Sequence, residues 1–408
     1  MNATIAKKRV HIIDALRGFA LAGIVIVHMV ENYTASPTPE GTMLGTHQGI
    51  ADNIVDGFIF LFLRGKFFAL FSFLFGLSFF LQMDSAHKKG QDLSGRFLWR
   101  LILLLGIGLF HHLFYRGDIL TIYAILGIFL IPFYKTSNKW LLAITALIFL
   151  GIGRYAVFLL NHGEPIFMSS QLDPSSPEIA AYFDILKNGS LAEVFYSNTT
   201  QGHLMKMEFQ TNIFGRAYLT FGFFLLGLFV GRLEFFRNFI DHMKSVKKVL
   251  IWSVVLFFIS IGLGAVLFAQ LGPEVSFDNW LAMFALTAID INNIAMTFIL
   301  ISLFVMAFKT KKGKRWLLKF APYGRMALSN YVLQSIIGTA LLYGWGMGYL
   351  GELRNIYTFL IAFLIIALQM VWSTWWLQKY HYGPFEWLWR SLTYFRRYPL
   401  KRISPQKY

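Results

Sequence analysis

The sequence predicts an all-α fold, a polytopic membrane helix bundle of about ten transmembrane helices with both termini in the cytoplasm. Apolar residues come in blocks of about 20, the length that an α-helix needs to cross the hydrocarbon core of a bilayer. Only 14% of the 408 residues are charged, against about a quarter in a soluble domain. Lysine and arginine concentrate in alternate loops, as expected for a multi-pass protein.

The apolar blocks define the candidate spans, at residues 12–30, 58–82, 97–115, 119–134, 140–160, 213–233, 249–270, 291–308, 321–350 and 356–377. Basic loops, beginning with Lys7, Lys8 and Arg9, alternate with loops poor in cations, and residues 31–57 contain none. An even number of spans keeps both termini on the basic, cytoplasmic side. The net charge of +16 therefore lies mainly in short loops between the apolar blocks, which indicates a lipid bilayer as the partner, and no nucleic-acid partner is expected.

The chain divides into an N-terminal membrane part of five spans (1–160), an outer loop or lid (161–212), a C-terminal membrane part of five spans plus an interfacial helix (213–395), and a basic tail (396–408). Within the lid, residues 178–187 predict a short surface helix. The aromatic and basic segment 380–397 predicts a helix at headgroup depth or, alternatively, one docked at the cytoplasmic mouth. Cysteine is absent, which excludes disulfides and thiol chemistry.

The first span carries titratable residues on one stripe. His28 follows Arg17 by eleven positions, which returns nearly to the same helix azimuth, and Asp14 lies on the same side. Ionisable residues inside a membrane are candidates for function by default. The plainer alternatives are a helix-end ion pair between Asp14 and Arg17, and a structural hydrogen bond from His28 to another helix.

Further polar residues gather at the outer ends of the spans, and Gly65 permits a helix break there. They are His47, Asp52, Asp56, Arg64, Lys66, His111, His112, Arg116, Asp118, Arg216, Asp290, Asn292 and Asn293. Histidines and carboxylates from separate segments at one depth favour a functional site. The histidine spacing defines no zinc site, so no metal is expected.

The ninth span begins with Pro322 and places Arg325 just inside the cytoplasmic surface, with Asn330 and Gln334 on one face further in. Arg325 and Arg17 suit an anion that enters from the cytoplasm, because guanidinium groups donate paired hydrogen bonds to phosphate. The alternative for Asn330 and Gln334 is interhelical hydrogen bonding.

Several stretches resemble the YeiB-like bacterial inner-membrane proteins of unknown function (DUF418 type), over residues 13–395: IDALRGFALAGI, GKFFALFSFLFGLSF, FHHLFYRGDILTIYAILGI, GRMALSNYVLQSIIGTALLYG and HYGPFEWLWRSLTYF. That family is distantly similar to transmembrane acyltransferases. Enzymes that O-acetylate surface polysaccharides carry an arginine, ten residues and a histidine in the first helix, as Arg17 and His28 do, although YeiB-like proteins more often have asparagine at the second position. In the lysosomal enzyme that acetylates heparan glucosamine, the catalytic histidine lies in the loop after the first helix, shortly before an aspartate. His47, with Asp56 downstream, resembles that pattern.

The resemblance implies a bacterial inner-membrane acyltransferase. Acetyl-CoA or another acyl-CoA, as co-substrate, would bind near Arg17 and Arg325, and His28, His47 or His111 would act as base toward an extracytoplasmic small-molecule or glycan acceptor. Asp118 or Asp56 would orient the imidazole, and Lys66 or His111 would stabilise the oxyanion. The alternatives are a transporter or permease and a non-catalytic scaffold, and a homodimer is allowed.

Overall fold

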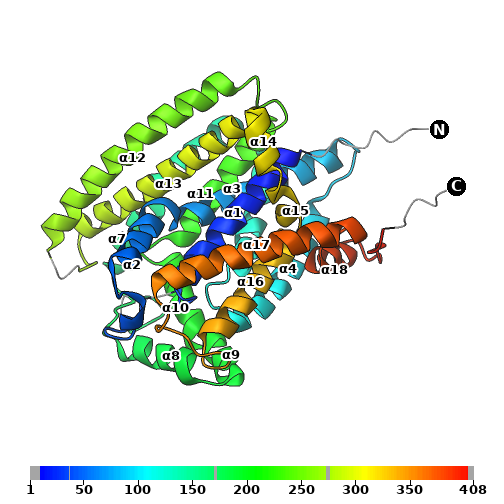
Figure 1. Cartoon of the computed structure of the whole chain (residues 1–408). Coiled ribbons are helices and arrows are strands. Elements are labelled where there is room, and N and C mark those ends of the chain that lie inside the picture. The colour runs from blue at the N-terminus through cyan, green and yellow to red at the C-terminus, as the bar shows by residue number, and fades with distance from the viewer. Residues whose placement is uncertain (1–9, 36, 170–171, 273–275, 403–408) are drawn as a thin grey trace, which may run out of the picture.

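The computed structural model describes residues 10–35, 37–169, 172–272 and 276–402, and this part of the chain is helical without a β-strand (Figure 1). The α-helices are α1 (His11–Val30), α2 (Ile50–Phe58), α3 (Lys66–His87), α4 (Ser94–Phe114), α5 (Leu120–Leu130), α6 (Asn138–Phe149), α7 (Ile152–Asn161), α8 (Pro177–Asn188), α9 (Leu191–Thr199), α10 (Gln201–Thr211), α11 (Arg216–Arg232), α12 (Met243–Leu271), α13 (Trp280–Lys309), α14 (Lys311–Leu317), α15 (Phe320–Arg325), α16 (Ala327–Leu342), α17 (Asn355–Lys379) and α18 (Pro384–Thr393). Shorter helical turns are η1 (Leu44–Thr46), η2 (Ile59–Leu63) and η3 (Pro132–Lys135). Lys7, Lys8, Arg9 and the end of the basic tail lie outside the described residues.

The described part of the chain contains 6 helical segments long and apolar enough to cross a membrane: α1, the segment Ile50–His87 that includes α2, η2 and α3, α4, α12, α13 and α17. The bent pairs α6–α7 (53°) and α10–α11 (58°) raise this number to 8. The two other predicted spans fall on α5, of 11 residues, and α16, of 16 residues, both shorter than the roughly 20 residues of a full crossing. The multi-pass helical fold is confirmed, whereas ten spans and cytoplasmic termini stay predictions.

The first helix, α1, lies inside the bundle and packs against α3, α13, α15, α16 and α17 (Figure 1). A Cβ atom on Gly18 would lie 2.2 Å from the Phe320 carbonyl oxygen, and one on Gly324 would lie 2.0 Å from the Asp14 carbonyl oxygen. These two glycines let α1 and α15 cross backbone against backbone, as small residues do between membrane helices. The crossing brings Arg17 next to Gly324.

Two helix breaks shape the functional region. The predicted break at Gly65 is confirmed, because η2 ends at Leu63 and Gly65, with φ +81°, precedes α3. The span predicted over 321–350 is not one continuous helix, since Met326 leaves helical geometry between α15 and α16, and α16 ends at Leu342. The backbone N–H groups at the start of α16 are satisfied by the Glu386 carboxylate, which local sequence could not reveal.

The described residues of segment 161–212 include α8, α9 and α10 at one end of the bundle (Figure 1). The assignment of this segment as an outer loop or lid stays a prediction. The predicted helix 178–187 is confirmed as α8. A capping box between Ser190 and Glu193 begins α9, which packs against α4. One hydrophobic core includes residues from the lid and from both predicted membrane parts.

The tail helix α18 docks on the bundle at the opposite end from the lid (Figure 1). The Trp389 indole N–H donates to the Arg100 carbonyl oxygen at 2.8 Å, and the Trp99 indole N–H donates to the Leu392 carbonyl oxygen at 3.2 Å. The Arg100 guanidinium also stacks 3.6 Å from the centre of a Trp389 ring. These contacts favour the docked alternative, and a place at headgroup depth stays a prediction.

Candidate functional site

Two cavities lie within the helix bundle, here named by the predicted orientation. The outer cavity, about 880 Å³, is lined by His28, Glu31, His47, Asp56, Arg64, Phe68, Tyr115, Arg116, Asp118, Lys206, Phe209, Arg216, Tyr331 and Asn355, among others. The inner cavity, about 380 Å³, is lined by Arg17, Ser78, Arg100, Tyr123, Arg325, Tyr331, His381, Glu386, Trp389 and Arg390, among others. Both volumes suit small ligands.

Tyr331, on α16, lines both cavities. Its side chain is buried, its ring centre lies 4.8 Å from that of His111, and its hydroxyl accepts the Ile119 N–H at 3.3 Å. One side chain therefore contributes to the partition between the inner and outer cavities.

The inner cavity contains the two predicted arginines. Arg17 donates to the Asp14 carboxylate at 3.2 Å, to the Ser78 hydroxyl at 3.1 Å and to the Gly324 carbonyl oxygen at 3.5 Å. Arg325 ends α15 and lines the same cavity. The structure thus brings Arg17 and Arg325 together, with Asp14 behind Arg17 as the predicted ion-pair partner.

Glu386, from α18, enters the inner cavity and was not among the predicted site residues. Its carboxylate accepts the Leu328 N–H at 2.7 Å, the Ser329 N–H at 3.1 Å and the Ser329 hydroxyl at 2.5 Å. Burial raises the pKa of this carboxyl, although its hydrogen bonds favour the charged form. The available signal was that Glu386 is the only acidic residue in an aromatic, basic tail.

Asn330 and Gln334 are buried outside the set of residues that line the two cavities. The Asn330 amide donates to the Ser373 hydroxyl at 2.9 Å and so joins α16 to α17. The Gln334 side-chain amide has no hydrogen-bond partner among the described residues. This placement favours the interhelical alternative for Asn330.

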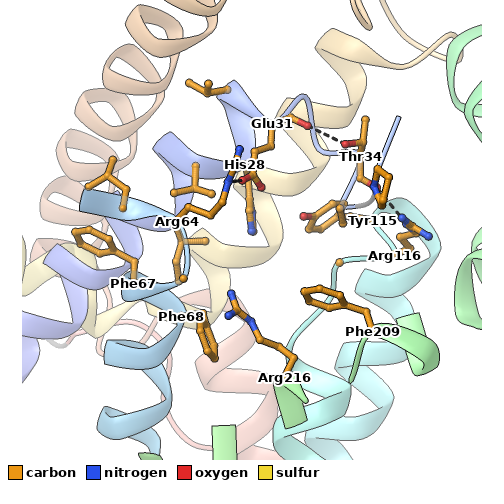
Figure 2. Close-up of a pocket in the computed structure, with 18 of the residues that line it drawn as sticks. His28, Glu31, Thr34, Arg64, Phe67, Phe68, Tyr115, Arg116, Phe209 and Arg216 are labelled. Atoms are coloured by element: carbon orange, nitrogen blue, oxygen red, sulfur yellow. Dashed lines mark hydrogen bonds and ion pairs between the residues drawn. The ribbon is translucent and has the colours of Figure 1, made fainter. Parts of the chain in front are cut away.

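His28 lies near the outer end of α1 and lines the outer cavity, as Figure 2 shows. Its ring centre lies 5.3 Å from that of Tyr33 and 5.0 Å from that of Tyr115. Its Nδ1 atom is buried without a hydrogen-bond partner among the described residues. His28 and Arg17 therefore face different cavities, because they stand about 16 Å apart along the helix axis.

His47 is paired with a carboxylate in the outer cavity. Its Nε2 contacts Asp56, from α2, and its Nδ1 lies 2.6 Å from the Thr46 hydroxyl. The Asn355 amide, at the start of α17, donates to Asp56 at 2.6 Å. The arrangement matches a base oriented by a carboxylate; Asn355 was missed because it follows Asp56 by almost 300 residues.

Asp118 lies in the turn between α4 and α5 and contacts a histidine and a lysine. It accepts from His111 Nδ1 at 2.7 Å and pairs with the Lys206 ammonium at 3.4 Å. Burial raises the pKa of Asp118, but Lys206 and the hydrogen bond to His111 outweigh that effect and hold it below its ordinary value. Asp118 thus pairs with His111 rather than with His28, and His111 is fully buried outside the set of residues that line the cavity.

Lys66 is buried at the start of α3, and its ammonium donates to the Phe60 carbonyl oxygen at 2.8 Å. It stands outside the set of residues that line the outer cavity. The cations that do line this cavity are Arg64, Arg116, Lys206 and Arg216. Lys206, from α10 of the lid, is not among the predicted site residues. No group of three or more histidine, aspartate or glutamate residues suited to a metal ion occurs in the described part of the chain.

Comparison with known protein families finds two matches, one in the N-terminal half of the chain and one in the C-terminal half. Residues 9–187 match the model of the catalytic domain of heparan-alpha-glucosaminide N-acetyltransferase. Residues 230–396 match the DUF418 family, described as proteins of unknown function.

Relatives extend over nearly the whole chain. The chain is 28% identical to the uncharacterized protein YxaH of Bacillus subtilis, over 98% of both proteins. It is 24% identical to the uncharacterized protein YeiB of Escherichia coli, over 93% of this chain and 95% of YeiB. The predicted resemblance is therefore confirmed: this helical chain with multiple candidate membrane spans is similar to YeiB-like proteins of the DUF418 type, and its N-terminal part is similar to the catalytic domain of an N-acetyltransferase.

Proposed function

We propose that the protein is an acyltransferase of the bacterial inner membrane, which moves an acyl group from cytoplasmic acyl-CoA to a hydroxyl or amine acceptor on the other side. The observation that carries this proposal is the pair of cavities that share Tyr331. Such an arrangement allows the donor and acceptor to approach from opposite ends of the bundle. The match of residues 9–187 to an acetyltransferase catalytic domain supports the same activity.

The inner cavity suits the donor. Arg17 and Arg325 would bind phosphate groups of CoA, because guanidinium groups form charge-assisted hydrogen bonds with phosphate. The apolar and aromatic lining beyond them, including Tyr123 and Tyr331, would accompany the acyl-bearing arm. The thioester would then reach the partition between the cavities.

The outer cavity suits the acceptor, and His47 is the first candidate for the base. Asp56 would hold the imidazole and stabilise the imidazolium, as the aspartate does in a catalytic triad. The acceptor oxygen or nitrogen would attack the thioester carbonyl carbon while His47 Nδ1, released from the Thr46 hydroxyl, takes its proton, because Nε2 faces Asp56. The C–S bond then breaks, and the sulfur leaves as the free thiol of CoA after receiving this proton from the imidazolium.

His28 is the alternative base. It lines the same cavity and its Nδ1 has no described partner, but no carboxylate contacts it within the described residues. The buried pair of His111 and Asp118 stabilises the turn that carries Arg116 and so has a positioning role in this proposal.

Acetyl-CoA binding to the detergent-purified protein is the first test. We expect saturable binding that weakens in Arg17→Ala and in Arg325→Ala, and that is unchanged in Arg315→Ala, an exposed arginine on α14 outside the inner cavity. Release of free CoA in the presence of acceptor mixtures should be lost in His47→Ala and kept in His87→Ala. Loss in His28→Ala alone would transfer the role of base to His28. Wild-type protein that binds no acyl-CoA thioester would refute the proposal.

A transporter is the second candidate, and the same observation favours it: two cavities at opposite ends of a bundle, with Tyr331 between them, resemble a closed passage. Uptake of a solute into proteoliposomes without any dependence on acyl-CoA would support this candidate. Free CoA release that requires an acceptor would exclude it as the main activity.

A further inference from the structure

The outer cavity has more cationic side chains than carboxylates. The carboxylates that line it are Glu31, Asp56 and Asp118, and the lysine and arginine side chains are Arg64, Arg116, Lys206 and Arg216. Each carboxylate has a partner within the described residues: Glu31 pairs with Arg64 at 2.5 Å, Asp118 with Lys206 at 3.4 Å, and Asp56 with His47. Arg116 and Arg216 have no ion-pair partner among the described residues.

Arg216 is the more central of these two cations. It begins α11 directly after Gly215, which has φ +61°. Its guanidinium carbon lies 3.5 Å from the ring centre of Phe68 and 5.9 Å from that of Phe209, and Figure 2 shows the side chain between these two rings. No protein hydrogen bond to this guanidinium occurs among the described residues. Its flat face is covered by Phe68, which leaves its N–H edges for a ligand.

The carboxylates that attract Arg216 from further away are already engaged. They are Asp290 and Glu31. Asp290 pairs with Arg154, and Glu31 pairs with Arg64. Lys66 interacts electrostatically with Arg216, and its side-chain nitrogen donates only to a carbonyl oxygen in the described structure. Among the described residues, therefore, no carboxylate pairs directly with Arg216.

Arg116 is the second cation of the outer cavity without an ion-pair partner among the described residues. Its side chain is 2% exposed, its Nε donates to the Thr34 carbonyl oxygen at 3.1 Å, and its guanidinium carbon lies 4.6 Å from the ring centre of Tyr182. Its Nη1 atom is buried without a hydrogen-bond partner in the described part of the chain. A buried charged donor without an acceptor is costly, and a bound anion would relieve that cost.

We infer that the outer cavity binds an anionic acceptor, a hydroxyl- or amine-bearing molecule whose carboxylate or phosphate group is held by Arg216 and attracted by Arg116. The role of this ligand as an acyl acceptor rests on the proposed function, whereas the anion site itself does not. Phe68, Phe209 and Tyr115 supply apolar surface for the body of the ligand. The anion at Arg216 would leave the ligand's hydroxyl or amine free to approach the histidines of the same cavity.

The test measures direct binding, without any acyl donor, so that its failure is distinct from failure of the transferase proposal. Glucuronate, glucose 6-phosphate and glucose are titrated calorimetrically into purified protein that carries Arg17→Ala, which weakens anion binding in the inner cavity. We expect at least one anionic sugar to bind about tenfold or more tightly than glucose, the effect of a single charge-assisted interaction. Adding Arg216→Gln should remove this preference, Arg216→Lys should keep part of it, and Arg315→Gln should leave it intact.

Two further measurements complete the test. Increasing ionic strength should weaken the anion binding of the parent protein, which keeps the inference testable if Arg216→Gln does not fold. Titration in nanodiscs of phosphatidylglycerol, compared with phosphatidylcholine, distinguishes the source of the anion: inhibition by the anionic lipid alone would assign the site to a lipid headgroup phosphate. Equal affinities for glucose and both anions, or an anion preference that survives Arg216→Gln, would overturn the inference.

Discussion

Replacement of Gly324 by alanine should loosen the crossing of α1 and α15 and weaken donor binding together. The new Cβ would lie 2.0 Å from the Asp14 carbonyl oxygen and 2.5 Å from the Gly18 nitrogen, whereas ordinary van der Waals contact begins near 3.4 Å. The two backbones must therefore separate by about 1.4 Å, an overpacking that costs about 1–3 kcal/mol of folding free energy. Because Arg17 and Arg325 lie on either side of this crossing, acetyl-CoA binding should fall as well.

The matched control is Gly262→Ala, on α12, where no atom lies within 4 Å of the new Cβ. That change should stabilise the helix by about 0.5–1 kcal/mol, since alanine is the better helix former. Thermal unfolding of both variants in the same detergent, followed by tryptophan fluorescence, measures the difference. If Gly324→Ala and Gly262→Ala unfold at the same temperature, the close crossing described here is wrong.

Three further predictions concern the partition, the outer turn and the tail helix. Tyr331→Ala should join the two cavities and raise acetyl-CoA hydrolysis by water in the absence of acceptor, while Tyr331→Phe, which keeps the ring, should not; thiol release measures both. Asp118→Ala should destabilise the fold by about 3–5 kcal/mol, because it leaves the buried Lys206 ammonium without its carboxylate; unfolding that matches the wild type would contradict this. Burial raises the pKa of Glu386 above its ordinary value of 4.5, so the folded protein holds this proton to higher pH than the unfolded chain does. The Glu386 contribution to stability should therefore be fully present below pH 4.5 and be lost as pH rises through the raised pKa, and unfolding curves of Glu386→Gln should lack that loss.

Hydrophobic block length predicted most of the fold, because each predicted span coincides with an apolar helix or helix pair. It did not predict the break at Met326. The division at Met326 depends on Glu386, a carboxylate from the far end of the chain that satisfies the N–H groups at the start of α16. Because this cap comes from a distant segment, the hydrophobic pattern around Met326 gives no sign of the helix break.

The sequence predicted which residues gather at the candidate site better than it predicted which of them pair with one another. Depth along the helices correctly gathered His28, His47 and Asp118 at one end and Arg17 and Arg325 at the other. Sequence could not show that Asp118 faces His111, or that Lys206 enters from the lid, because both contacts depend on how separate segments pack. Residues buried in helix contacts, such as Asn330, were indistinguishable by spacing from those that line a cavity.

The partition at Tyr331 has an electrical consequence. Where two polar cavities approach each other from opposite ends of a membrane protein, the transmembrane voltage falls mainly across the thin region that separates them. Moving one elementary charge through that region involves about 2.3 kcal/mol of work per 100 mV. In the proposed reaction the acyl group moves outward through the partition while the acceptor proton moves inward to the sulfur. This exchange transfers no net charge, so its equilibrium should not depend on membrane potential.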